Sequence, residues 1–249
     1  MAKIISVHSF RGGTGKSNIT ANIATLLAAE GRRVGVVDTD LASPGIHVLF
    51  GMRGEQITRP LNDFLWDQCA IQECAHDMSA GLGVNGRVFL LPASIKPGDI
   101  TKILRQGYDA RKLTGGLRDL IKALDLDVLM LDTHPGLNEE TLLSLVISHA
   151  IAIVMRPDQQ DFEGTGVTVQ VARQLKVPNM QIVVNKVPTS FEPDQVRSQV
   201  EEAYGCEVGG VLFHSDEMMV LASSGIFCLH HPDHSLVQEF KQAATKLVQ

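Results

Sequence analysis

The sequence predicts an α/β fold in which helices cover both faces of a doubly wound, mainly parallel sheet. Aliphatic runs alternate with helical patterns along the chain, and this alternation indicates right-handed strand–helix–strand crossovers. The runs are continuous, as is typical of strands buried on both faces. Polar motifs follow several runs directly, and ligands bind at these strand ends in such sheets. We expect the 249 residues to form one domain, 1–249.

Each expected element rests on a local pattern. The strands are expected at the apolar runs Lys3–His8, Val34–Val37, Val128–Leu131, Ile151–Met155, Ile182–Val184 and Gly210–Phe213. The helices are expected where apolar residues recur at helical spacing, at Ser17–Glu30, Pro97–Gln106, Ala110–Leu124, Glu139–Ser148, Glu163–Leu175, Glu192–Tyr204 and along 236–248. Residues 52–97 are the hardest to assign. There we expect a short helix at Leu61–Trp66, a loop at Met78–Gly86 and a strand at Arg87–Leu91.

The bulk composition is that of an ordinary globular chain, with 44% hydrophobic and 20% charged residues. A net charge of −6 argues against a strongly basic nucleic-acid binder, although a local basic patch is compatible with it. The first residues enter a strand directly, and no apolar run reaches about 18 residues. We therefore expect no signal peptide, no transmembrane helix and a cytoplasmic location.

The four cysteines have no C-x-x-C spacing. They are Cys69, Cys74, Cys206 and Cys228. This spacing fits reduced thiols of a cytosolic protein better than a disulfide framework or a zinc site.

Residues 5–17 are the most informative stretch, because an apolar strand enters a glycine-rich loop and then a helix. Glycines let backbone N–H groups converge on one anion, and the helix N-terminus adds partial positive charge. Lys16 is expected to reach the outer phosphates, and the Ser17 hydroxyl is expected to bind Mg²⁺. The loop residues expected to bind a nucleotide are Gly12, Gly13, Thr14, Gly15, Lys16, Ser17 and Asn18.

The loop departs from the common G-x-x-x-x-G-K-[ST] pattern, because Phe10 stands where the first glycine belongs. The adjacent Gly12 and Gly13, with a cation before them, resemble the deviant Walker A motif of the ParA/MinD family of P-loop ATPases. The resemblance implies ATP as the nucleotide, hydrolysis to ADP and phosphate, and a homodimer that encloses ATP. The family's signature lysine touches the partner's nucleotide, and Arg11 occupies its position here. We expect Arg11 to keep this catalytic contact in trans.

Two carboxylates, Asp38 and Asp40, follow the run Val34–Val37. Beside a phosphate loop, such a pair suits the water shell of Mg²⁺ and the attacking water. The resemblance makes this segment switch I. It implies that Asp40 positions the hydrolytic water, and we assign Asp38 to the metal. The alternative interpretation is a polar turn that caps the strand.

The run Val128–Leu131 ends at Asp132, which is a Walker B pattern whose aspartate holds Mg²⁺ through water. By the same resemblance, Gly136 is the switch II glycine whose N–H senses the γ-phosphate. His134 stands where the family often has proline. We interpret it as a loop residue that fills space, with a catalytic base as the alternative.

Three later loops carry the remaining candidates for nucleotide binding. Asp158 matches an acidic residue that reaches the partner's ribose in the family, although a solvated loop explains it equally well. Asn185 is followed by Pro188 rather than by the aspartate that reads guanine, so we expect Asn185 to face an adenine edge. His214 lies where the family has another base-contacting loop.

The basic residues cluster before and along one expected helix, at Lys96, Lys102, Arg105, Arg111, Lys112, Arg118 and Lys122. A solvated helix face is the plain interpretation. The alternative is non-specific DNA binding, which depends steeply on salt. We expect the apolar stripe of the last helix, 236–248, to dock on the core rather than on a membrane.

We interpret the chain as a nucleotide switch for intracellular positioning or partitioning of a plasmid, chromosome, division site or organelle. This role implies an activating partner protein and a surface, for which we favour DNA at the nucleoid over the membrane. The alternative is a metabolic or metal-cluster-assembly P-loop ATPase of the same superfold. The iron–sulfur carriers of the superfamily rely on a C-x-x-C pair, so the cysteine spacing counts against that branch.

Overall fold

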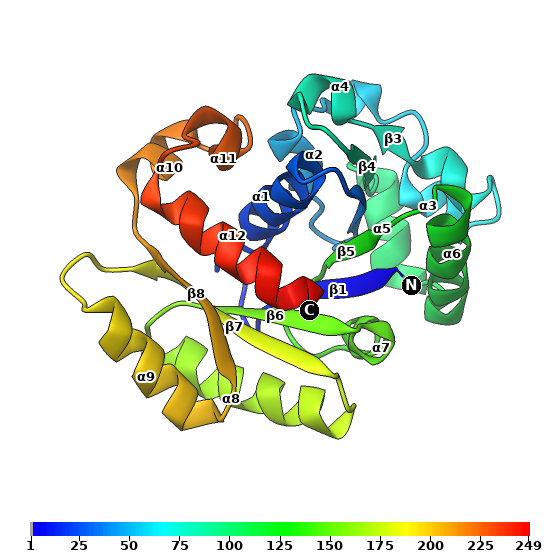
Figure 1. Cartoon of the computed structure of the whole chain (residues 1–249). Coiled ribbons are helices and arrows are strands. Elements are labelled where there is room, and N and C mark those ends of the chain that lie inside the picture. Colours follow the sequence, from blue (N-terminus) through cyan, green and yellow to red (C-terminus); the bar gives the residue numbers. More distant parts are fainter. Residues whose placement is uncertain (1) are drawn as a thin grey trace.

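The computed structural model of the protein describes residues 2–249 and contains one eight-stranded sheet (Figure 1). The strand order is β3-β4-β2-β5-β1-β6-β7-β8. Neighbouring strands in the described chain are parallel, except that β3 runs antiparallel to β4. This confirms the predicted doubly wound, mainly parallel architecture.

Two of the expected strands have the expected bounds, and the others are longer by one to three residues at one or both ends. Their bounds are β1 (Lys3–His8), β2 (Arg33–Asp38), β3 (His76–Asp77), β4 (Arg87–Leu91), β5 (Val128–Asp132), β6 (Ala150–Met155), β7 (Asn179–Val187) and β8 (Glu207–Phe213). The strand β7 is the longest, because Asn179 still pairs with β6 at its start and Val187 still pairs with β8 at its end.

Helices follow the strands in the expected alternation. The longer helices are α1 (Lys16–Ala29), α5 (Pro97–Gln106), α6 (Ala110–Ala123), α7 (Glu139–Ile147), α8 (Gln159–Gln174), α9 (Pro193–Tyr204) and α12 (Ser235–Val248). The shorter ones are α2 (Ile46–Leu49), α3 (Leu61–Leu65), α4 (Ser79–Leu82), α10 (Asp216–Leu221) and α11 (Phe227–His230). In the part of the chain that the structure describes, none of these helices is long and apolar enough to cross a membrane.

Helix α8 begins four residues earlier than the expected start at Glu163. The Asp158 side chain accepts a hydrogen bond from the N–H of Asp161 and so caps the first turn. The capping aspartate, rather than the first apolar residue, therefore sets the start of this helix.

The prediction of a loop at Met78–Gly86 is wrong at its beginning, where helix α4 forms shortly after strand β3. Asp77 accepts hydrogen bonds from the backbone and hydroxyl of Ser79, which favours a turn at this point. Strand β3 has two residues and pairs with β4 at the sheet edge. A strand this short shows no alternating pattern in the sequence, so its only signal is tertiary pairing.

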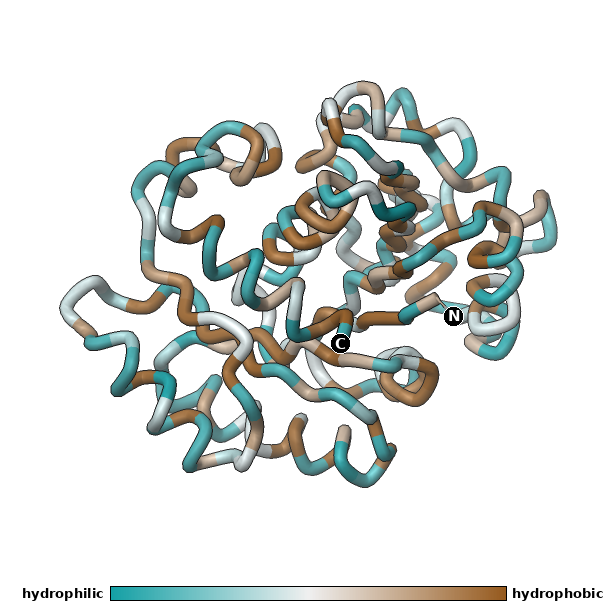
Figure 2. The backbone as a smooth tube through the Cα atoms, in the orientation of Figure 1, coloured by the Kyte–Doolittle hydropathy of each residue, from teal (hydrophilic) through white to brown (hydrophobic). Residues whose placement is uncertain are grey.

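The core lies on both faces of the sheet, because successive side chains of a strand point to opposite sides. Ile5 and Val7 of β1 pack toward α1 and α12, whereas Ile4 packs in the cluster with α6. A third cluster joins β6, β7 and β8 to α8 and α9. Figure 2 shows apolar colour along the central strands and an alternation of apolar and polar turns along α12.

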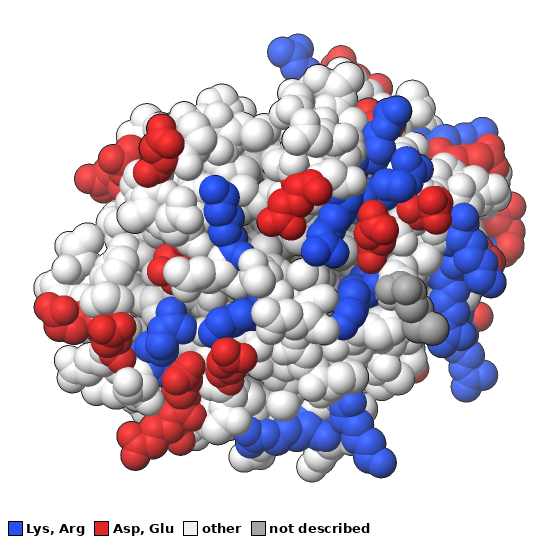
Figure 3. All heavy atoms as spheres, viewed as in Figure 1, with Lys and Arg blue, Asp and Glu red and all other residues white. Residues whose placement is uncertain are grey.

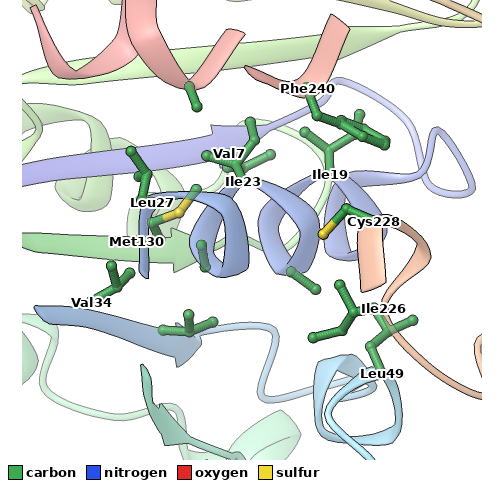
Figure 4. Packing of buried hydrophobic residues seen from close by; sticks show 14 of the residues in the cluster. Val7, Ile19, Ile23, Leu27, Val34, Leu49, Met130, Ile226, Cys228 and Phe240 are labelled. Carbon is green, nitrogen blue, oxygen red and sulfur yellow. The ribbon is translucent and has the colours of Figure 1, made fainter. Parts of the chain in front are cut away.

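The apolar stripe of α12 docks on the core, as expected from its spacing. Its buried residues are Leu236, Val237, Phe240, Ala243, Ala244 and Leu247. In Figure 4, Phe240 lies beside Ile19 of α1 and near Val7 of β1. The last helix thus covers the helix that follows the glycine-rich loop and holds it against the sheet.

We predict that Phe240→Ala destabilises the protein by about 3–5 kcal/mol, because the ring is 1% exposed and its removal leaves a cavity. Urea unfolding measures the free energy of unfolding. Leu104→Ala serves as the control, since Leu104 is 68% exposed and should cost less than about 0.5 kcal/mol. Equal effects of the two substitutions would contradict the assigned packing of α12.

Candidate nucleotide site

The glycine-rich loop connects the end of β1 to the start of α1. Gly13 and Gly15 have positive φ angles of 76° and 100°, which other residues adopt only with strain. A side chain at Gly15 would also collide with the amide of Asn185. The Asn185 Nδ2 donates to the carbonyl of Thr14 at 2.7 Å. The loop is therefore shaped by its glycines and held from outside by the end of β7.

A cavity of about 640 Å³ opens above this loop. It brings together seven residues that the sequence assigns to nucleotide chemistry, namely Gly12, Gly13, Gly15, Lys16, Ser17, Asn18 and Asp40. Thr14 is buried beside it, and its hydroxyl has no hydrogen-bond partner within residues 2–249. The cavity has the place and the backbone shape of a phosphate site.

Lys16 is the buried cation of this cavity, which Lys186 also lines. Its side chain is mostly buried, and its Nζ donates to the hydroxyl of Ser9 at 3.1 Å. Burial lowers the pKa of Lys16, while the charges of Asp132 and Asp40 oppose that shift. A buried ammonium of this kind gains more from an incoming phosphate than an exposed one does. Ser9, which the sequence analysis missed, holds Lys16 in place.

Ser17 and Asp132 form the candidate magnesium site. The Ser17 hydroxyl donates to Asp132 Oδ2 at 2.6 Å, and the other oxygen, Oδ1, is buried without a hydrogen-bond partner in the described chain. Burial raises the pKa of Asp132 to about 6. An unsatisfied carboxylate oxygen beside a hydroxyl fits a hard cation such as Mg²⁺. The residues present therefore fit the predicted ion.

Asp38 lies next to Asp132, because β2 and β5 pair these two residues in register. Its carboxylate is fully buried and accepts from the N–H groups of Asp40 and Gly45, both at 3.1 Å. Burial raises the pKa of Asp38 well above its ordinary value, and the neighbouring Asp132 adds to this. These bonds give Asp38 the task of shaping the switch I loop, and its assignment to the metal stays a prediction.

Asp40 extends from the switch I loop toward switch II. Its Oδ1 accepts from the Nδ1–H of His134 at 2.7 Å and from the N–H of Ser43 at 3.0 Å. Both Asp40 and His134 line the cavity. The interpretation of His134 as a residue that only fills space is thus wrong, since it contacts the expected catalytic carboxylate.

Gly136 occupies the predicted switch II position with a φ of 86°. Its N–H donates to the carbonyl of Ser9 at 3.0 Å. Sensing of a γ-phosphate by this N–H stays a prediction, and it would require the bond to Ser9 to open.

Arg11 lies at the mouth of the loop and contacts acidic residues of its own chain. Its Nη1 is 3.4 Å from Oδ1 of both Asp158 and Asp161. Arg156 binds the same two carboxylates more closely, with Nε 2.9 Å from Asp161 and Nη2 3.1 Å from Asp158. Burial opposes ionisation of Asp161, but the hydrogen bonds from Arg156 lower its pKa overall. Asp158 therefore holds Arg11 here, and contact with a partner's ribose stays a prediction.

The expected base-binding residues lie apart in the structure. Asn185 faces the loop backbone, and the neighbouring Lys186 donates from Nζ to the carbonyl of Gly13 at 2.9 Å. His214 does not line the phosphate cavity and lies instead at a separate cavity of about 530 Å³ with Asp216. Ser223, between α10 and α11, lines the phosphate cavity and was not expected. Contacts of Asn185 and His214 with a base stay predictions.

The chain is similar to known proteins in sequence and in fold. A family model described as ParA, NUBPL iron-transfer P-loop NTPase, matches residues 1–248. An ATP-binding protein of Methanocaldococcus jannaschii is 25% identical over all of this chain and 88% of its own length. The iron–sulfur cluster carrier protein of Aquifex aeolicus is 26% identical over 99% of this chain and 67% of its own length.

Among solved structures, the septum site-determining protein MinD of Pyrococcus horikoshii, complexed with Mg-ADP, superposes with a TM-score of 0.82. It covers 98% of this chain and 95% of its own, at 20% identity, so this likeness concerns the fold. Because the family model spans the chain and the fold agrees with it, this chain belongs to the ParA family and is a P-loop ATPase of the ParA/MinD type.

Proposed function

We propose that the protein is an ATP-driven switch, in which binding of ATP closes a homodimer and hydrolysis opens it. Lys16 and the loop N–H groups would bind the phosphates, and Ser17 with Asp132 would hold Mg²⁺. Bound Mg²⁺ supplies charge neutralisation at the phosphates. Asp40 would orient the attacking water from the cavity wall. We take residues 1–249 as one ATPase unit, with an activating protein as the further partner.

The observation that carries this proposal is the position of Arg11. It stands in the signature position of the loop, is 38% exposed and is held by carboxylates of its own chain. Its ion pairs are long, and Arg156 stays on the same carboxylates, so Arg11 is free to exchange these contacts for a partner's phosphates. We infer that the present contacts are the resting position of an arginine that acts in trans.

For the task that the switch serves, we propose metal-cluster assembly or delivery in preference to positioning of a cargo. This departs from our first interpretation of the sequence. The family model is that of an iron-transfer NTPase, and the Aquifex relative is an iron–sulfur cluster carrier protein. The structural likeness to MinD lies below 25% identity and supports the fold alone.

The thiols determine how a cluster could be held. Thiolates are the form that binds iron, and burial raises the pKa of Cys74 and Cys228 to about 12 and that of Cys206 above its ordinary value. Cys69 is partly exposed, and its sulfur lies 3.5 Å from that of Cys74. A cluster on this protein would therefore use Cys69, or it would be passed on by a partner protein.

A second candidate function, retention on DNA, is favoured by the basic face of α6. Figure 3 shows Lys and Arg gathered over this helix, with acidic residues beside them. Two lysines of this basic cluster already contact other side chains. The Nζ of Lys102, on the preceding helix α5, lies 3.6 Å from the ring centre of Trp66, and Lys112 of α6 pairs with Asp67. The exposed Arg111 and Arg118, seven residues apart on one helix face, remain for phosphate contacts.

We predict that Asp40→Ala binds ATP but loses all except a slow residual hydrolysis, and that it accumulates as a dimer. Lys16→Ala should lose nucleotide binding altogether, because the buried cation of the cavity is gone. Light scattering with Mg-ATP measures the dimer, and phosphate release measures turnover. An Asp40→Ala protein that stays monomeric with ATP would show that Asp40 is structural rather than catalytic.

We predict that Arg11→Ala spares ATP binding by the monomer but removes ATP-driven dimerisation and most hydrolysis. Arg11→Lys should keep much of both, since a cation remains. Asp158→Asn should shift dimerisation to lower ATP concentration, because it weakens the contact within the chain. Sedimentation with a slowly hydrolysed ATP analogue measures these states, with the exposed Arg32→Ala as control. Wild-type dimerisation of Arg11→Ala would refute the role in trans.

We predict that the protein, incubated without oxygen with ferrous iron and sulfide, retains both after desalting. Cys69→Ser should lower the iron bound per chain, whereas Cys206→Ser, at a buried thiol, should not. Iron and sulfide are counted chemically, with and without ATP. Absence of bound iron in every nucleotide state would remove the carrier role.

We predict that DNA retention, if it is the function, appears only with ATP and falls when Arg111 and Arg118 are both changed to Glu. Loss of two phosphate contacts should lower the slope of log affinity against log salt by about 2. Filter binding at several salt concentrations measures this slope, and Lys241→Glu on α12 is the control. A wild-type protein that does not bind DNA in the ATP state would exclude this function.

A further inference from the structure

We propose that His134 is a positioning residue for ATP hydrolysis, which holds the Asp40 carboxylate in the orientation that the attacking water needs. The contact joins the loop after β2 to the loop after β5, so it also makes the two switch loops one unit. The proposal rests on the proposed function, because it requires Asp40 to act on that water.

The two oxygens of Asp40 have different surroundings. Oδ1 accepts from the imidazole of His134 at 2.7 Å and from the N–H of Ser43 at 3.0 Å. Oδ2 has no hydrogen-bond partner in residues 2–249. The Asp40 side chain is 16% exposed and lines the phosphate cavity. One oxygen is therefore fixed by two donors, and the other is left for a water molecule.

The backbone on both sides of His134 is anchored to the end of β1. Thr133 donates to the carbonyl of Val7 from its N–H at 3.3 Å and from its hydroxyl at 3.0 Å. Gly136 donates from its N–H to the carbonyl of Ser9 at 3.0 Å. Because β1 leads directly into the phosphate loop, the imidazole is aimed from the same rigid element that places the nucleotide.

The contact is short because the two loops leave the sheet side by side. Asp38 and Asp132 are paired in register at the ends of β2 and β5, and Asp40 and His134 each follow two residues later. Any movement of the 133–136 loop with the nucleotide state therefore reaches Asp40 through the imidazole. A residue that only filled space would leave Oδ1 with one donor and the two loops uncoupled.

The test compares three substitutions at His134. The amide nitrogen of Asn reaches the place of Nδ1, whereas that of Gln reaches the place of Nε2. We expect His134→Ala to lower kcat by about ten- to a hundredfold with little change in KM, because only the orientation of the reacting water is lost. His134→Asn should restore most of the lost kcat, and His134→Gln should not. His230→Ala, at an exposed histidine of α11, is the matched control.

Two outcomes would overturn the proposal. A wild-type kcat in His134→Ala would show that the contact with Asp40 does not contribute to hydrolysis. Recovery of kcat in His134→Gln but not in His134→Asn would show that hydrolysis depends on Nε2 rather than on the bond from Nδ1 to Asp40. In an Asp40→Ala background, His134→Ala should have no further effect on the slow residual hydrolysis, since its partner is gone. If thermal melting shows that His134→Ala is unfolded, the difference in kcat between His134→Asn and His134→Gln still tests the proposal.

A readout without turnover comes from proton NMR of the nucleotide-free protein. The hydrogen-bonded Nδ1–H of His134 should give a downfield signal that is absent in His134→Asn and lost or shifted in Asp40→Ala. A signal unaffected by Asp40→Ala would contradict the contact.

ATP-driven dimerisation and turnover of the wild type are measured in parallel. Their absence would refute the proposed function, whereas their presence with unaltered His134 variants would refute this inference alone.

Discussion

The site depends on the burial of opposite charges where β1, β2 and β5 end. Lys16, Asp38 and Asp132 are all buried there. Burial disfavours the charged form of each, so the pKa of Lys16 is lowered and those of the two aspartates are raised. Backbone N–H groups satisfy Asp38, but one oxygen of Asp132 remains without a partner in the described chain. The charges of phosphates and Mg²⁺ would complete this arrangement.

A second arrangement of charges keeps the signature arginine available. Asp161 is almost fully buried, and a buried carboxylate that loses its only cation is strongly destabilised. Arg156 guards against this, because it binds both Asp161 and Asp158. Arg11 adds two longer contacts of 3.4 Å to carboxylates that are already paired. The proposed movement of Arg11 toward a partner would thus leave no unpaired buried charge behind.

The features that the sequence predicted well are those that local chemistry determines. The phosphate loop needs glycines and a lysine at fixed spacing, and the buried parallel strands need continuous aliphatic runs, so residues 3–17 and the central sheet were predictable. The contacts that escaped prediction depend on tertiary position. Nothing near His134 in the sequence indicates Asp40, 94 residues away. Nor does the pattern around Asp38 show that backbone N–H groups would take both of its oxygens. The pair β3 and α4 was too short for any periodicity to reveal.

The segment 52–97, which the sequence left least defined, contains residues that bear on both proposed tasks. The proposed switch uses residues at the ends of β1, β2 and β5. The partly exposed thiol Cys69 belongs to this segment, as do Trp66 and Asp67, which contact the α5 and α6 lysines Lys102 and Lys112. The candidate thiol and the candidate basic face are therefore neighbours on one surface. A cargo that binds there would contact α6, whose partly buried Ile121 joins the same apolar cluster as Leu131 at the end of β5. That cluster connects the surface to the end of β5, where Asp132 lies.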